Sequence, residues 1–164
     1  MFNINDVVVH YREGLSTILS INKMNEKDYF LLKVNRLTDS ETIYVPVETA
    51  DNIIRHILNE KEADKLLKYL KGINIEYNAN TKQRRDFYKK MLSSGKVKDI
   101  AYLYRQLYFY YKTGGEESQT MKLGPVDIEM LSNAKNILLD ELALSYKVKR
   151  DTIDSFIEKR INKL

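Results

Sequence analysis

The chain has 164 residues, 43% of them hydrophobic and 30% charged, a balance typical of a globular protein with one ordinary domain or two small ones. It contains no cysteine, which excludes disulfides, thiolate nucleophiles and cysteine-based zinc sites. The first residues, MFNINDVVVH, lack the pattern of a secretory signal, and no segment approaches the roughly 18 apolar residues of a membrane span. We therefore expect a cytoplasmic protein with no membrane partner.

The net charge of +4 is unevenly distributed. Residues 1–50 contain five basic and seven acidic residues, a charge of −2, which leaves +6 for the rest of the chain. Such asymmetry is typical of two modules with different partners, and the basic module is then the candidate for nucleic-acid binding.

Residues 6–47 are rich in short β-type runs separated by turn-like segments. The runs are DVVVHY, LSTILSI, DYFLLKV and ETIYVPV. Four or five strands in about fifty residues predict a small antiparallel barrel, with Gly14 in a tight turn. Pro46 has no N–H, so its strand should lie at an edge or end there.

From about residue 47 the hydrophobic period becomes helical. The six predicted helices are VETADNIIRHILN, NEKEADKLLKYLKG, TKQRRDFYKKMLSSG, VKDIAYLYRQLYFYYKTGG, GPVDIEMLSNAKNILLDELALSYKV and KRDTIDSFIEKRINK. Pro125 and Asp127 suit the start of the fifth helix. The sequence thus predicts an α+β protein, with a β-barrel domain over residues 1–50 and a helical domain over residues 51–164.

The third predicted helix lies in the most basic part of the chain, residues 80–98. Lys82, Arg85 and Lys89 share one face by i, i+3, i+7 spacing, with Asp86 and Lys90 as a possible i, i+4 pair. A separate, apolar stripe consists of Phe87, Tyr88, Met91 and Leu92, with Arg84 on its flank. The cationic face is either a solvated surface or a surface for phosphate.

Other candidate sites are weaker. His10 and His56 are far apart and have no neighbour at metal-ligand spacing, and the Gly114-Gly115 pair lacks the residues of a phosphate loop. The tyrosines of residues 102–111 favour core packing or, where exposed, stacking. We therefore expect neither an enzyme nor a protein with a cofactor, a metal or a small-molecule substrate.

Several segments, in this order, resemble the CarD/CdnL family of bacterial transcription regulators. They are NDVVVHYREGLSTI, YFLLKV, IYVPVETA, RRDFYKKMLSSGKVKDIAYLYRQL and MLSNAKNILLDELAL. The resemblance covers residues 3–146. It implies a Tudor-like N-terminal barrel, shared with transcription-repair coupling factor, that binds the β subunit of RNA polymerase. It also implies a helical domain that contacts promoter DNA at the upstream edge of the melted region and stabilises the open complex without reading a specific sequence.

This resemblance assigns the candidate residues to two surfaces. The residues expected to contact DNA are Lys82, Arg84, Arg85, Lys89, Lys90 and Lys96. The residues expected near the polymerase are Arg36, Thr42, Ile43 and Tyr44. Through the polymerase, the protein would associate with the nucleoid.

The chain departs from the family where relatives commonly carry a tryptophan that wedges into the minor groove. It has no tryptophan, and Thr81 or Lys82 occupies that place, depending on the alignment. DNA binding is then mostly electrostatic, or a nearby residue such as Tyr77 replaces the wedge. Tyr44 also stands where relatives often carry a polymerase-facing arginine. Two alternatives stay open: an adaptor on RNA polymerase without DNA contact, and an enzyme of nucleic-acid processing, for which no catalytic constellation is present.

Overall fold

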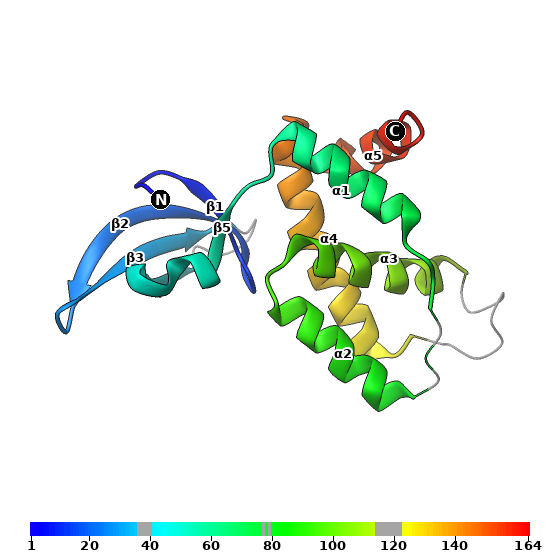
Figure 1. Cartoon of the computed structure of the whole chain (residues 1–164), viewed down its shortest axis with the longest axis horizontal. Helices are drawn as coiled ribbons and strands as arrows, with labels where there is room; N and C mark the ends of the chain where they lie inside the picture. The colour runs from blue at the N-terminus through cyan, green and yellow to red at the C-terminus, as the bar shows by residue number, and fades with distance from the viewer. Residues whose placement is uncertain (36–40, 77, 79, 114–122) are drawn as a thin grey trace.

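The computed structural model describes residues 1–35, 41–76, 78, 80–113 and 123–164. A five-stranded sheet forms the N-terminal unit and a group of helices forms the C-terminal unit, and the two units lie side by side (Figure 1). The predicted α+β class is confirmed.

The strands pair in one antiparallel sheet in the order β4-β3-β2-β1-β5. Their bounds are Val7–His10 (β1), Gly14–Met24 (β2), Lys27–Val34 (β3), Thr42–Pro46 (β4) and Ile54–His56 (β5). The four strands expected before residue 47 are confirmed, and Gly14 has the expected positive φ, at 76°. Pro46 ends an edge strand, as its missing N–H requires.

The sheet is open rather than a closed barrel, since β4 and β5 are its two edges and are not paired with each other in the described residues. The 3₁₀ segment η1, Val47–Asn52, connects these edges and inserts Ala50 into the sheet core. This core consists of Val8, Ile18, Phe30, Leu32, Val45, Ala50 and Ile54.

The helix predicted for VETADNIIRHILN is wrong. The segment forms η1 and then β5, in which Ile54 pairs with His10 of β1 and is buried in the sheet core. A short apolar run does not distinguish a helix from a strand by periodicity, and here pairing with β1 decides the outcome. The sheet consequently extends to His56, beyond the boundary expected at residue 50.

The other five predicted helices are confirmed. They are α1 (Glu60–Gly72), α2 (Thr81–Ser93), α3 (Val97–Thr113), α4 (Pro125–Ser145) and α5 (Ile153–Ile161), the last preceded by a 3₁₀ turn, η2 (Arg150–Thr152). The start of α4 is as expected, because the Asp127 carboxylate accepts a hydrogen bond of 3.0 Å from the N–H of Gly124. At the start of α1, Asn59 and Glu62 form a reciprocal capping box.

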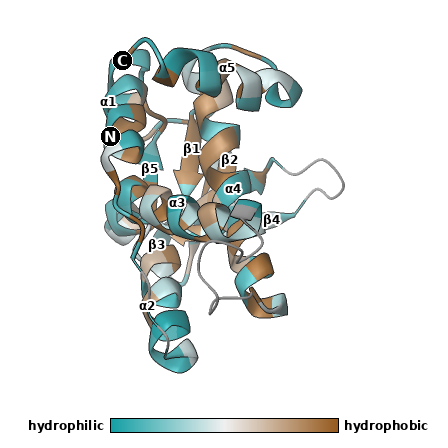
Figure 2. Ribbon diagram, turned by 90° about the vertical axis from the view of Figure 1, so that its right-hand side faces the viewer, coloured by the Kyte–Doolittle hydropathy of each residue, from teal (hydrophilic) through white to brown (hydrophobic). Residues whose placement is uncertain are grey.

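The helices share one apolar core, which α4 crosses. Among its fully buried members are Leu67 of α1, Leu103 of α3 and Leu142 of α4. Val9 of β1 belongs to this same core, with Leu15 of β2 packed against it. Figure 2 shows β1 as strongly hydrophobic, whereas much of α2 is hydrophilic. The two units therefore share buried contacts in addition to their chain connection.

Candidate functional site

Helix α2 presents a cationic surface to solvent. Lys82, Lys89 and Lys90 are exposed along the helix, and Lys96 is exposed just after it. Asn80 caps the helix by accepting a 3.1 Å hydrogen bond from the N–H of Gln83. The four lysines form a set that we call the α2 lysines.

The α2 lysines are not paired with carboxylates in the described part of the chain. In the part of the chain that the structure describes, none of them forms an ion pair, and the expected i, i+4 pair between Asp86 and Lys90 is not made. Their charge is thus available to an anionic partner.

Arg84 is not part of this surface. Its side chain is 5% exposed, it donates a 3.0 Å hydrogen bond to the carbonyl of Asn78, and it lies 3.6 Å from the Asp127 carboxylate. With its guanidinium buried against these partners, Arg84 packs α2 against α4 and does not face solvent, where the sequence led us to expect it to contact DNA.

Arg85 has an intermediate position. Its guanidinium donates to both oxygens of Asp127, at 3.2 and 3.4 Å, and its side chain remains 31% exposed. Burial opposes ionisation of Asp127, but the hydrogen bonds from Arg85 and Gly124 and the charge of Arg84 outweigh it and hold the pKa of Asp127 below its ordinary value. Arg85 therefore helps to hold α2 against α4 through Asp127, while part of its side chain stays accessible to a partner.

The apolar stripe of α2 is confirmed in part. Tyr88 is buried, and burial raises the pKa of its hydroxyl to about 12. Phe87, however, is 47% exposed and meets Tyr102 edge-to-face, with the ring centroids 6.3 Å apart. Thr81 is the first residue of α2, and Tyr77 lies outside the described residues.

The second candidate surface is the edge strand β4. Thr42 and Tyr44 are exposed, Tyr44 by 51%, and Ile43 is half-buried against the sheet core. Tyr44 lies beside Leu31 of β3 on the outer face of the sheet. Arg36 falls outside the described residues. Since β4 pairs only with β3 in the described chain, its other side offers unpaired backbone groups to a partner.

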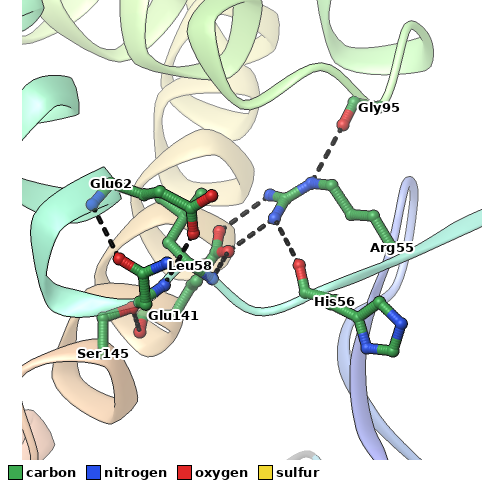
Figure 3. Close-up of polar contacts among 8 residues, drawn as sticks. Arg55, His56, Leu58, Glu62, Gly95, Glu141 and Ser145 are labelled. Atoms are coloured by element: carbon green, nitrogen blue, oxygen red, sulfur yellow. Dashed lines mark hydrogen bonds and ion pairs between the residues drawn. The ribbon is translucent and has the colours of Figure 1, made fainter.

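An ion pair between a half-buried arginine and a buried glutamate connects the two units (Figure 3). Arg55 of β5 donates to both carboxylate oxygens of Glu141 of α4, at 2.5 and 2.7 Å. The Leu58 N–H donates to the same carboxylate at 3.0 Å, and Arg55 also reaches the Gly95 carbonyl at 3.5 Å. Neither residue was a sequence candidate, because 86 positions separate them and no local pattern links them.

Close packing supports this junction. Gly95 follows α2 with φ of 67°, and a Cβ there would lie 2.7 Å from the Cβ of Tyr11 in the β1–β2 turn. Gly14, at the other side of that turn, would place a Cβ 3.5 Å from Ile137 of α4. The end of α2 is thus held directly against the sheet unit.

The described residues contain no helix long and apolar enough to cross a membrane. They also contain no group of three or more His, Asp or Glu side chains suited to a metal ion.

Comparison with protein families gives two matches. The model of the CarD-like/TRCF RID domain matches residues 2–58, and the model of the CarD C-terminal domain matches residues 65–158. The first covers the sheet together with β5, and the second covers most of the helical unit. The chain therefore belongs to the CarD family, non-enzymatic transcription factors that interact with RNA polymerase.

Proposed function

We propose that the protein binds the β subunit of RNA polymerase through the β4 edge and contacts the phosphates of promoter DNA through the α2 lysines, stabilising the open complex. The observation that supports the DNA contact is a set of exposed lysines that form no ion pair with any described carboxylate, on a helix packed against the sheet unit. Arg85, which keeps partial exposure, adds to this set, whereas Arg84 does not.

Tethering explains how so few phosphate contacts suffice. A sheet unit held on the polymerase raises the effective concentration of α2 near the DNA, so the affinity for free DNA can stay low. Because the Arg55–Glu141 pair joins α4 to the sheet and Tyr11 packs against Gly95 at the end of α2, little ordering of the two units is left to oppose binding.

Phosphate contacts carry no sequence information, so the protein should act on promoters without reading a sequence. In place of the tryptophan of its relatives, α2 begins with Thr81 and Lys82, which leaves electrostatic attraction as the main source of affinity.

The test uses fork DNA and the variant Lys82→Gln/Lys89→Gln/Lys90→Gln. Each phosphate contact contributes about −0.9 to the slope of log affinity against log salt, so three contacts give about −3. The variant should lose this part of the slope and bind all sequences more weakly. A matched control replaces three exposed lysines of α1, Lys61, Lys65 and Lys68, with Gln, and should keep most of it.

Equal slopes for parent and variant would contradict the DNA contact. The protein would then be an adaptor on RNA polymerase, and its complex with the polymerase would be unaffected by the three substitutions.

A further inference from the structure

A small groove lies where the β1–β2 turn meets helices α2 and α4. Its volume is about 210 Å³, and its lining comes from Tyr11, Arg12, Lys89, Leu92, Ser93, Asn133 and Ile137. Two cationic side chains, two hydroxyl-bearing side chains and an amide thus share one groove with an apolar part formed by Leu92 and Ile137. The residues come from both units of the protein, so the groove exists only while the units are docked.

Hydrogen bonds and ring packing hold the backbone of the β1–β2 turn, which carries Arg12, in a defined conformation. The Nδ1 atom of His10 accepts the backbone N–H groups of Arg12 and Glu13, at 3.2 and 3.0 Å. The ring of Tyr11 contacts that of His10 at a tilt of 32°, with centroids 4.8 Å apart, and the Cβ of Tyr11 packs against Gly95. Arg12 therefore projects from a defined backbone beside the end of α2.

The groove is cationic in the part of the chain that the structure describes. Within the described ranges, Arg12 and Lys89 form no ion pair, and no carboxylate lines the groove. The groove beside the β2–β3 turn differs, because Glu26, Asp28 and Glu48 line it. The groove between Arg12 and Lys89 is therefore suited to an anion, whereas the groove beside the β2–β3 turn is not.

We infer that the Arg12–Lys89 groove binds one backbone phosphate of the DNA that lies along α2. This inference rests on the proposed function, and adds a DNA contact from the sheet unit, which is otherwise assigned to the polymerase. The groove is smaller than the roughly 300 Å³ at which pockets for whole small molecules begin, which favours a single phosphate group over a nucleotide. Lys89 belongs both to the groove and to the α2 lysines, so the two surfaces are continuous.

The first test measures fork-DNA affinity against salt for Arg12→Gln. One lost contact should make the slope of log affinity against log salt shallower by about 0.9, so a fourfold rise in salt should shrink the ratio of parent to variant affinity about 3.5-fold. Lys23→Gln is the matched control, because it removes an exposed cation of the same unit outside the groove, and should keep the parent slope to within the error. Thermal unfolding should be similar for both variants.

The second test locates the DNA in the groove. Since the chain has no cysteine, Asn133→Cys places one thiol in the groove wall and Lys23→Cys places one far from it. Fork DNA should slow alkylation at position 133 and leave position 23 unchanged. Inorganic phosphate, added at the same phosphate concentration as the DNA, should give little protection; equal protection would show a site for free phosphate and overturn the assignment to DNA.

The outcomes separate this inference from the proposed function. If Arg12→Gln behaves like Lys23→Gln while the triple lysine variant loses its salt slope, the groove assignment is wrong and DNA binding by α2 stands. If no variant changes the slope, the proposed DNA contact is itself wrong.

Discussion

The junction between the units should depend strongly on the Arg55–Glu141 pair. The perturbation is Glu141→Gln, which keeps the shape of the side chain and removes its charge. In the parent, this carboxylate is 1% exposed and accepts three hydrogen bonds, two from Arg55 and one from the N–H of Leu58. In the variant, an amide NH₂ would face the guanidinium, and at least one hydrogen bond would be lost.

The magnitude follows from burial. Breaking a fully buried ion pair by removing one partner costs about 3–5 kcal/mol. Arg55 remains 26% exposed, so water recovers part of its solvation, and the lower end of that range, about 3 kcal/mol, applies. For a chain of this length the loss corresponds to a fall in Tm of about 6–12 °C.

The neighbouring residue provides the control. Asp140 pairs with Arg150, and both side chains are more than a third exposed, so Asp140→Asn should cost no more than about 1 kcal/mol. Urea unfolding followed by circular dichroism measures both losses in free energy of unfolding. Similar losses for Glu141→Gln and Asp140→Asn would refute the reasoning, and would mean that apolar packing, such as that of Val9 and of Tyr11 against Gly95, holds the units together without help from the ion pair.

Three further predictions concern single residues. Tyr44→Glu should weaken capture of the polymerase β subunit with little loss of stability, because Tyr44 is exposed on an edge strand. The control Lys23→Glu, on β2, should leave the capture unchanged. If Tyr44→Glu also leaves the capture unchanged, this part of β4 is excluded from the contact. Burial, with a smaller contribution from Arg12, holds the pKa of His10 below its ordinary 6.5, although the charge of Glu13 opposes this shift. Above pH 6.5 the ring is neutral in both the folded and the unfolded state, so its stabilising effect on the fold is fully present. This stability is lost as pH falls through the pKa of the folded state. His10→Asn keeps an acceptor for the turn, and its free energy of unfolding should vary less with pH than the parent's between about pH 7.5 and pH 5.5; equal variation would show that other groups are responsible. Thr81→Trp should strengthen binding to fork DNA more than to duplex, because less unstacking is required at a fork, and an equal gain on both would exclude a wedge.

Local patterns in the sequence determined most of the secondary structure. Strands β1 to β4 follow alternating or β-branched runs bounded by turns, and helices α1 to α5 follow apolar residues at helical spacing, so neighbours along the chain contain the information. The same patterns placed the cationic face on α2 and, with the quoted segments, indicated the family. The clustering of isoleucines at 53, 54 and 57 was also a local signal for β structure, since β-branched side chains favour strands.

Only the tertiary structure decided which of these residues face solvent and which face a distant partner. Ile54 joins the sheet because β1 offers it a hydrogen-bonded edge, and Arg84 turns inward because Asp127, 43 positions later, is buried beside it. The Arg12–Lys89 groove and the Arg55–Glu141 pair likewise join segments that are far apart in sequence. The residues next to an arginine or a glutamate in the sequence can be the same whether its side chain is solvated or is paired with a buried opposite charge. These roles therefore depend on contacts that exist only after the chain has folded.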